Sequence, residues 1–188
     1  MSSEYKNIVI MKFGPYAGYS VEEIINIKKE EGKKTGKFYI GYSGVFCRPY
    51  IVNNLVSFSK GEKIYLMLVE TKSDFIPTTV DRFNKYSLDK NKWINLPKDV
   101  LLVGNKSKDH FAFIGKSLKK SNIDLDLSQY STLSGNMFPN LDQPLSEYFR
   151  FRVDKACGVY TPNSSKEKIV KVSYISELIN PYSVYIST

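Results

Sequence analysis

A short stretch near the N-terminus constrains the fold more than any other part of the chain. Ser20 stands three residues before Glu23, the S-x-x-E spacing of a capping box, in which each residue's side chain bonds the other residue's backbone N–H at a helix start. Val21, Ile24 and Ile25 follow at the spacing of one helix face. A helix that begins just after Ser20 and buries this apolar face is therefore expected.

Most other patterned segments favour strands. The segment from Asn7 to Phe13 is β-branched and apolar and is followed by a Gly-Pro pair, which predicts a strand before the helix. Further strands are expected at 37–42, 64–69, 100–103, 151–160, 169–175 and 182–186, and 110–114 is read either as a strand or as the start of a helix running to 118. Residues 122–134 are expected to be mostly irregular, Trp93 to anchor its stretch to the core, and a short helix to run from Asp142 through Arg150.

The order of these segments indicates the fold class. One early helix is followed by several strands, a short helix and more strands, without regular alternation. Such an order is typical of an α+β fold with a mostly antiparallel or mixed sheet and two or three helices. The length fits a single domain over residues 1–188.

The charge balance points to anionic partners. The chain has 27 Lys and Arg against 19 Asp and Glu, a net charge of +8. A field of this sign attracts phosphates, anionic lipid headgroups and acidic proteins. A lysine-rich composition that reflects an A·T-rich genome gives the same balance without any function, and the charge alone does not separate the two explanations.

The cysteines and the apolar runs bear on location and cofactors. Cys47 and Cys157 lie far apart with no C-x-x-C partner, which favours two free thiols over a disulfide. No cleavage-site pattern follows the N-terminal residues, and no apolar run is long enough to cross a bilayer. We therefore expect a soluble, cytoplasmic protein without membrane association, metal site or cofactor.

The segment from Phe38 to Tyr50 holds the densest group of unusual residues. Tyr39, Tyr42 and Tyr50 offer faces on which a base or sugar can stack, and Arg48 can hold a phosphate through two hydrogen bonds. The two glycines of the segment allow a close approach of backbone to ligand. The segment is thus a candidate wall of a nucleotide pocket; the alternative is a strand–turn–strand corner whose aromatic residues belong to the core.

A second group, from Phe149 to Cys157, is basic and aromatic. On a strand, Arg150 and Arg152 would share one face, with Lys155 on the other. This arrangement could follow a phosphate backbone, or it could be a solvated strand face balanced by Asp154. Residues 104–108, Gly-Asn-Lys-Ser-Lys, follow a strand but lack the Walker pattern, so a hairpin turn is expected there.

Catalytic chemistry has a weak basis in this chain. Cys47 stands next to Arg48, and a neighbouring cation lowers a thiol pKa. A nucleophilic cysteine also needs a base, for which the chain offers one histidine, His110. Glu70 and Asp154 are further candidates for acid–base roles.

Two short motifs carry a resemblance to a family of proteins. Gly41-Tyr42-Ser43-Gly44 followed by Cys47-Arg48-Pro49, and the later run 152–157, Arg-Val-Asp-Lys-Ala-Cys, resemble an uncharacterised family of bacterial and phage proteins with a Gly-Tyr-Gly-Gly run, a Cys-His-Pro and an Arg-Val-Asp-Lys-x-Cys. Here Ser43 replaces a glycine and Arg48 a histidine. The resemblance implies no known activity. It implies a phage or mobile-element origin, with action against host defence in the host cytoplasm.

These observations lead to one main hypothesis and two alternatives. The main hypothesis is a non-catalytic protein that binds a phosphate-bearing ligand, either a nucleotide (a signalling nucleotide included) or a nucleic acid. Its expected ligand-binding residues are Tyr39, Tyr42, Arg48, Tyr50, Arg150, Arg152 and Lys155. The alternatives are a nucleotide-processing hydrolase or transferase that uses Cys47 or His110, and an inhibitor or adaptor whose basic face docks on an acidic protein.

Overall fold

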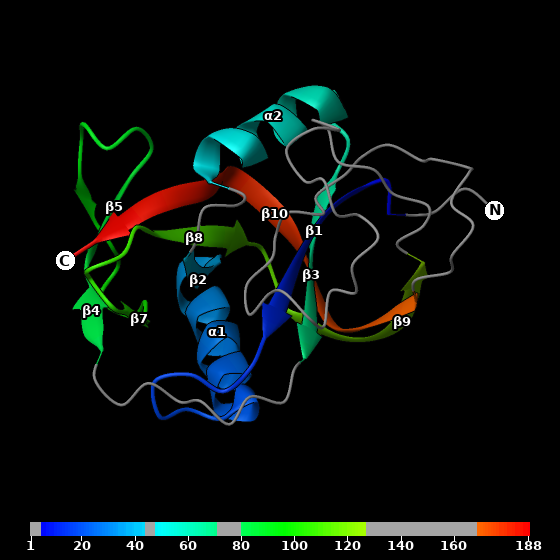
Figure 1. The fold of residues 1–188 in the computed structure, drawn as a ribbon, viewed down its shortest axis with the longest axis horizontal. Helices are drawn as coiled ribbons and strands as arrows, with labels where there is room; N and C mark the ends of the chain where they lie inside the picture. The colour runs from blue at the N-terminus through cyan, green and yellow to red at the C-terminus, as the bar shows by residue number, and fades with distance from the viewer. Residues whose placement is uncertain (1–4, 44–47, 71–79, 127–168) are drawn as a thin grey trace.

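Strands make up most of the structure, a computed structural model that describes residues 5–43, 48–70, 80–126 and 169–188 (Figure 1). The first elements follow the sequence pattern closely. Strand β1 (Asn7–Phe13) leads into helix α1 (Val21–Thr35) through the predicted capping box. The Ser20 hydroxyl accepts from the Glu23 N–H at 3.2 Å, and the Glu23 carboxylate accepts from the Ser20 N–H at 2.7 Å.

One long strand organises the sheet. Strand β10 (Ile169–Ser187) pairs antiparallel with β3 (Ile64–Glu70) and β9 (Lys119–Asp126) along its first half, and with β8 (His110–Gly115) and β5 (Lys85–Ser87) along its second half. Its register to β8 shifts between Leu178 and Ser183. In Figure 1 it crosses the middle of the molecule and connects the part that holds β1, β3 and β9 with the part that holds β8 and β5.

The remaining strands complete these two parts. Strand β1 pairs in parallel with β3, and β2 (Phe38–Ser43) pairs antiparallel with β8. Strand β6 (Ile94–Asn95) pairs with β5, whereas β4 (Asp81–Phe83) and β7 (Leu102–Gly104) form a separate two-stranded sheet. The predicted α+β class with a mixed sheet is confirmed, with two helices in the described residues.

Helix α2 (Pro49–Ser59) was not predicted. The residues from Arg48 to Tyr50 were read as part of a pocket wall or of a strand–turn–strand corner, but they begin a helix. Proline at the first helical position is preorganised for a helix start because its φ is fixed and its missing N–H needs no partner there. Val52 and Leu55 then pack into the core on one face. Pro49 was the sequence feature from which the start of this helix could have been predicted.

Several other expectations change. Residues 122–126, expected to be irregular, belong to strand β9, and the two late strands are a single one, β10. Residues 110–115 are a strand, not a helix start. Trp93 is 39% exposed and so does not anchor its stretch to the core. The turn after Gly104 is present, but β7 pairs with β4 and not with β8, so it is not a hairpin. The predicted elements at 142–160 lie outside the described residues, and the single-domain assignment stays a prediction. No helix among the described residues is long and apolar enough to span a membrane.

Apolar side chains pack on both faces of β2 and β8. Phe38, Ile40 and Tyr42 point into a core with side chains of β1, β3, α1 and α2. Tyr39 points to the other side, into a second core that is covered by residues around β4 and β7. This alternation follows from the two-residue period of a strand.

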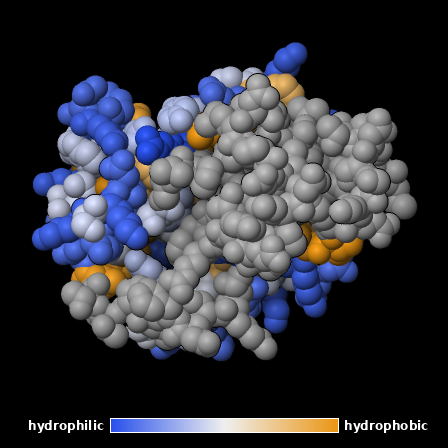
Figure 2. Space-filling view, viewed as in Figure 1, coloured by the Kyte–Doolittle hydropathy of each residue, from blue (hydrophilic) through white to orange (hydrophobic). Residues whose placement is uncertain are grey.

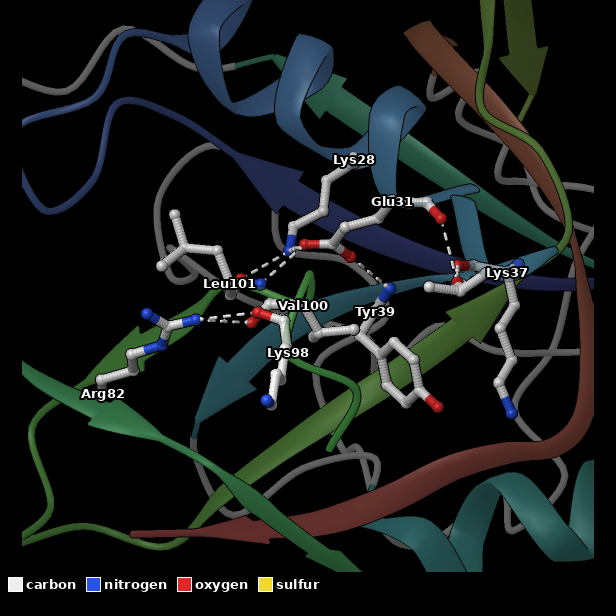
Figure 3. Close-up of polar contacts among 9 residues, drawn as sticks. Lys28, Glu31, Lys37, Tyr39, Arg82, Lys98, Val100 and Leu101 are labelled. Carbon is white, nitrogen blue, oxygen red and sulfur yellow. Dashed lines mark hydrogen bonds and ion pairs between the residues drawn. The ribbon is translucent and has the colours of Figure 1, made fainter. Parts of the chain in front are cut away.

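A buried ion pair joins α1 to β2 and to the segment before β7 (Figure 3). Lys28 and Glu31 form this pair with side-chain exposures of 5% and 1%. The Glu31 carboxylate also accepts from the backbone N–H groups of Tyr39, at 3.1 Å, and Leu101, at 2.9 Å. The Lys28 ammonium donates to the carbonyl of Leu101 at 2.6 Å. Burial lowers the pKa of Lys28, while the Glu31 charge opposes this shift.

We expect Glu31→Leu to destabilise the protein more than Lys28→Met. The Glu31 substitution leaves the buried Lys28 ammonium without its counter-charge and two backbone N–H groups without an acceptor, a loss in the range of about 3–5 kcal/mol for breaking a buried pair. Lys28→Met leaves the carboxylate with two backbone donors. Urea unfolding measures both changes in the free energy of unfolding.

The exposed pair Glu30–Lys33 on the same helix is the matched control. Glu30→Leu and Lys33→Met should each cost less than about 1 kcal/mol, because exposed pairs contribute little. Equal losses at the two pairs would contradict the role given to Glu31.

Candidate functional site

Two of the predicted ligand-binding tyrosines lie in the core. Tyr39 is 1% exposed and Tyr42 is 3% exposed, and they point to opposite faces of β2. The Tyr42 ring stacks on Phe113 with centroids 4.1 Å apart, and its hydroxyl lies 2.9 Å from that of Ser183. Burial raises the pKa of Tyr39 to about 12. The structure does not bring these two rings together on one surface.

The other predicted residues are placed differently. Tyr50 is 49% exposed on the first turn of α2, and Arg48 is the residue that precedes this helix. The Arg48 Nε is buried and has no hydrogen-bond partner among the described residues. Arg150, Arg152 and Lys155 lie outside the described residues, as do Cys47 and Asp154. The binding roles of Tyr50, Arg48, Arg150, Arg152 and Lys155 and the catalytic roles of Cys47 and Asp154 stay predictions.

A cleft in another part of the molecule gathers lysines and aromatic rings. We call it the lysine cleft; it lies between the β5–β6 turn and the β7–β8 turn, beside the end of β10, with a cavity volume of about 300 Å³. Its charged and aromatic lining consists of Phe83, Lys90, Trp93, Lys106, Lys108, Asp109, His110 and Tyr185. In Figure 2, hydrophilic residues cover much of the side on which Figure 1 places β4 and β5.

Hydrogen bonds hold both turns in place. In the β5–β6 turn, the Asp89 carboxylate accepts from the N–H groups of Asn91, at 2.8 Å, and Lys92, at 3.3 Å, which lowers the pKa of Asp89. In the β7–β8 turn, the carbonyl of Asn105 accepts from the Lys108 N–H at 3.1 Å and from the His110 ring at 2.7 Å. The cleft therefore has walls of fixed backbone from which flexible lysine side chains extend.

The charges of the cleft are only loosely paired. Lys90 lies 3.6 Å from Asp109, which links the two turns, and 5.0 Å from the centre of the Tyr185 ring. Lys106 lies 3.7 Å from Asp81. Lys108 has no ion-pair partner among the described residues. Long exposed contacts of this kind are weak, so the three ammonium groups can turn toward a bound anion.

His110 forms part of the wall and is held neutral. Its Nε2 must carry the proton, because the Asn105 carbonyl can only accept. The ring is 8% exposed and packs 4.7 Å from the Phe83 ring centroid. Burial is the main cause that lowers its pKa, and the nearby Lys108 charge acts in the same direction. Its proposed pairing with Cys47 cannot be followed, since Cys47 is outside the described residues.

The turn that follows Gly104 is not a phosphate loop. The backbone N–H groups of Lys106, Ser107 and Lys108 all have internal acceptors. The lysine side chains, and not these backbone groups, are therefore the donors that this turn offers to the cleft. The sequence signal for the cleft was two lysine-rich turns, one of them next to the chain's one tryptophan.

Comparisons with known proteins add nothing to this geometry: no family model, no curated protein and no solved structure matches the chain. Within the described residues, no group of three or more His, Cys, Asp or Glu side chains could hold a metal ion. Glu70 is exposed at the end of β3, where its N–H lies 3.3 Å from the Ser173 hydroxyl. The lysine cleft is therefore the candidate functional site.

Acid should destabilise the protein partly through His110. The unfolded chain takes up a proton near pH 6.5, whereas the folded protein, with its lowered pKa, takes it up only at lower pH. Stability that is present above about pH 6.5 is thus lost as the pH falls through the folded pKa. Urea unfolding between about pH 7.5 and about pH 5 should show a shallower loss for His110→Gln than for the wild type. Parallel curves would contradict this assignment.

Proposed function

We propose that this protein is a non-catalytic binding protein for a phosphate-bearing ligand, a nucleotide, and that the ligand binds in the lysine cleft. The carrying observation is that Lys90, Lys106 and Lys108 line one cleft together with the exposed ring of Trp93. The ligand class is the one expected from the sequence, but the residues are different. The net charge of +8 supports the choice of an anionic ligand.

The lysines account for the phosphate. Each ammonium group has three donors, and two of the three groups now rest against single carboxylates at 3.6 and 3.7 Å. A phosphate offers more charge and more acceptor oxygens than one carboxylate. Charge-assisted hydrogen bonds to it are stronger than the exposed contacts that they replace.

Trp93 accounts for the base. A tryptophan that is 39% exposed beside a basic cleft presents a face on which a planar base can stack. Removing such a stack weakens binding by about 1–3 kcal/mol per base. A single ring of this kind suits one nucleotide better than a long strand, which uses a row of aromatic side chains.

A second group of lysines is the competing place for an anion. Lys29, Lys33 and Lys116 line a groove between α1 and the β8–β9 turn, with a cavity volume of about 280 Å³. This groove has no aromatic side chain in its lining, and Lys33 already bonds Glu30 at 2.6 Å. The lysine cleft is therefore the better nucleotide site.

Trp93 makes the proposal directly measurable. Since it is the only tryptophan of the chain, its fluorescence reports on the cleft alone. We expect adenosine and guanosine nucleotides to change this fluorescence in a saturable way, and Lys106→Ala/Lys108→Ala to weaken the affinity by at least about tenfold. Calorimetry on Trp93→Leu measures the contribution of the ring without the fluorescence signal.

Lys119→Ala/Lys120→Ala is the matched control, because it removes the same charge from exposed positions on β9. Its affinity should stay close to that of the wild type. Equal weakening by both double variants, or no saturable signal with any nucleotide, would refute the proposal. A steep loss of affinity with salt for oligonucleotides, but not for mononucleotides, would assign the cleft to nucleic acid instead.

A further inference from the structure

A second pocket lies next to the lysine cleft and shares His110 with it. We call it the edge pocket; it is bordered by the β1–α1 loop, by α1, by the outer edge of β2 and by residues 101–103, and His110 lines both cavities. Its lining includes Tyr19, Ile24, Ile27, Gly41, Ser43 and Leu102. The lining is mainly apolar, with a few polar groups that include Lys28 and Ser43, as in small-molecule sites.

The backbone of β2 faces this pocket with its unpaired edge. Strand β2 pairs only with β8 among the described strands. In an antiparallel pair, alternate residues turn both their N–H and their C=O away from the partner. The Tyr39 N–H points outward, because it donates to the Glu31 carboxylate. By the same alternation, Gly41 and Ser43 also direct their backbone groups outward, and both residues line the edge pocket.

These outward groups of Gly41 and Ser43 have no hydrogen-bond partner among the described residues. Along a strand edge, the C=O of one outward residue and the N–H of the next outward residue are neighbours. Here these are the Gly41 C=O, an acceptor, and the Ser43 N–H, a donor. Side by side and next to an apolar cavity, they match a molecule that carries a donor and an acceptor on one planar edge.

We propose that the edge pocket binds a small planar heterocycle with a cis-amide edge, as found in lactams and in nucleobases. The ring N–H of the ligand donates to the Gly41 C=O, and its carbonyl accepts from the Ser43 N–H. The ring itself lies against the aliphatic side chains of Ile24, Ile27 and Leu102. This site is independent of the lysine cleft, because its ligand needs no phosphate.

The geometry favours a small ligand over an added peptide strand. Strand addition needs a row of outward residues with free backbone groups. On β2 the Tyr39 N–H is already taken by Glu31, which leaves Gly41 and Ser43 as the free outward positions of the strand. The cavity volume is about 80 Å³, about half that of an engineered cavity that holds benzene. It admits one edge of a ring while the rest of the molecule stays in the opening.

The test compares two probes that differ in one donor. We expect 2-pyridone to bind, seen by saturation-transfer NMR and by chemical-shift changes, and N-methyl-2-pyridone to bind about tenfold more weakly because it cannot donate to Gly41. Ser43→Pro removes the outward N–H that donates to the carbonyl of either probe and leaves the ladder to β8 intact, so it should weaken the binding of both probes. Equal binding of both probes by the wild type, or no binding of either, would overturn the proposal.

Two further variants keep the test valid if Ser43→Pro does not fold. Ile27→Phe narrows the cavity and should weaken 2-pyridone binding by about tenfold or more; Ser43→Ala keeps the backbone N–H and should leave it unchanged. Unchanged binding by Ile27→Phe, or weaker binding by Ser43→Ala, would contradict the assignment. Lys106→Ala/Lys108→Ala should not affect 2-pyridone. Failure at the edge pocket is thereby separated from failure at the lysine cleft.

Discussion

The carboxylate of Glu31 is the interaction on which the rest of the arrangement depends. It is buried, and it accepts from the Lys28 ammonium and from the backbone N–H groups of Tyr39 and Leu101. One helix, one strand and one connecting segment are joined at this single group (Figure 3). Because a buried charge without partners costs several kcal/mol, these elements are held in one relative position.

Both candidate sites follow from that arrangement. The segment fixed at Leu101 continues into β7 and then into the turn that carries Lys106 and Lys108. Arg82 supports the same segment by donating to the carbonyl of Lys98 at 3.2 Å. Glu31 also occupies the Tyr39 N–H and so defines where the unpaired edge of β2 begins. The ion pair thus positions the lysine cleft and the edge pocket, although neither Lys28 nor Glu31 lines the lysine cleft.

The long strand β10 makes the second connection. Its first half pairs with β3 and β9, and its second half lies between β8 and β5. The end of this strand borders the lysine cleft through Tyr185. His110 is shared by the cleft and the edge pocket, and its ring is held by the Asn105 carbonyl and by Phe83.

The sequence alone was enough to predict the elements whose signals are local. The capping box at Ser20, the β-branched run from Asn7 to Phe13 and the α+β class could be predicted, because a cap or a strand period depends on near neighbours. It did not determine which face each aromatic residue of β2 would meet. Burial of Tyr39 and Tyr42 depends on the layers packed on both sides of the strand.

The convergence of the lysines in one cleft depends on the tertiary structure. The β5–β6 and β7–β8 turns are separate in sequence, and each reads as an ordinary solvated turn. They meet because β5 and β8 both pair with the same half of β10. Likewise, β2 has an unpaired edge among the described strands because it pairs there with β8 alone, which no local pattern specifies. Local signals select the elements, whereas long-range pairing and the buried charge of Glu31 decide which side chains share a cavity.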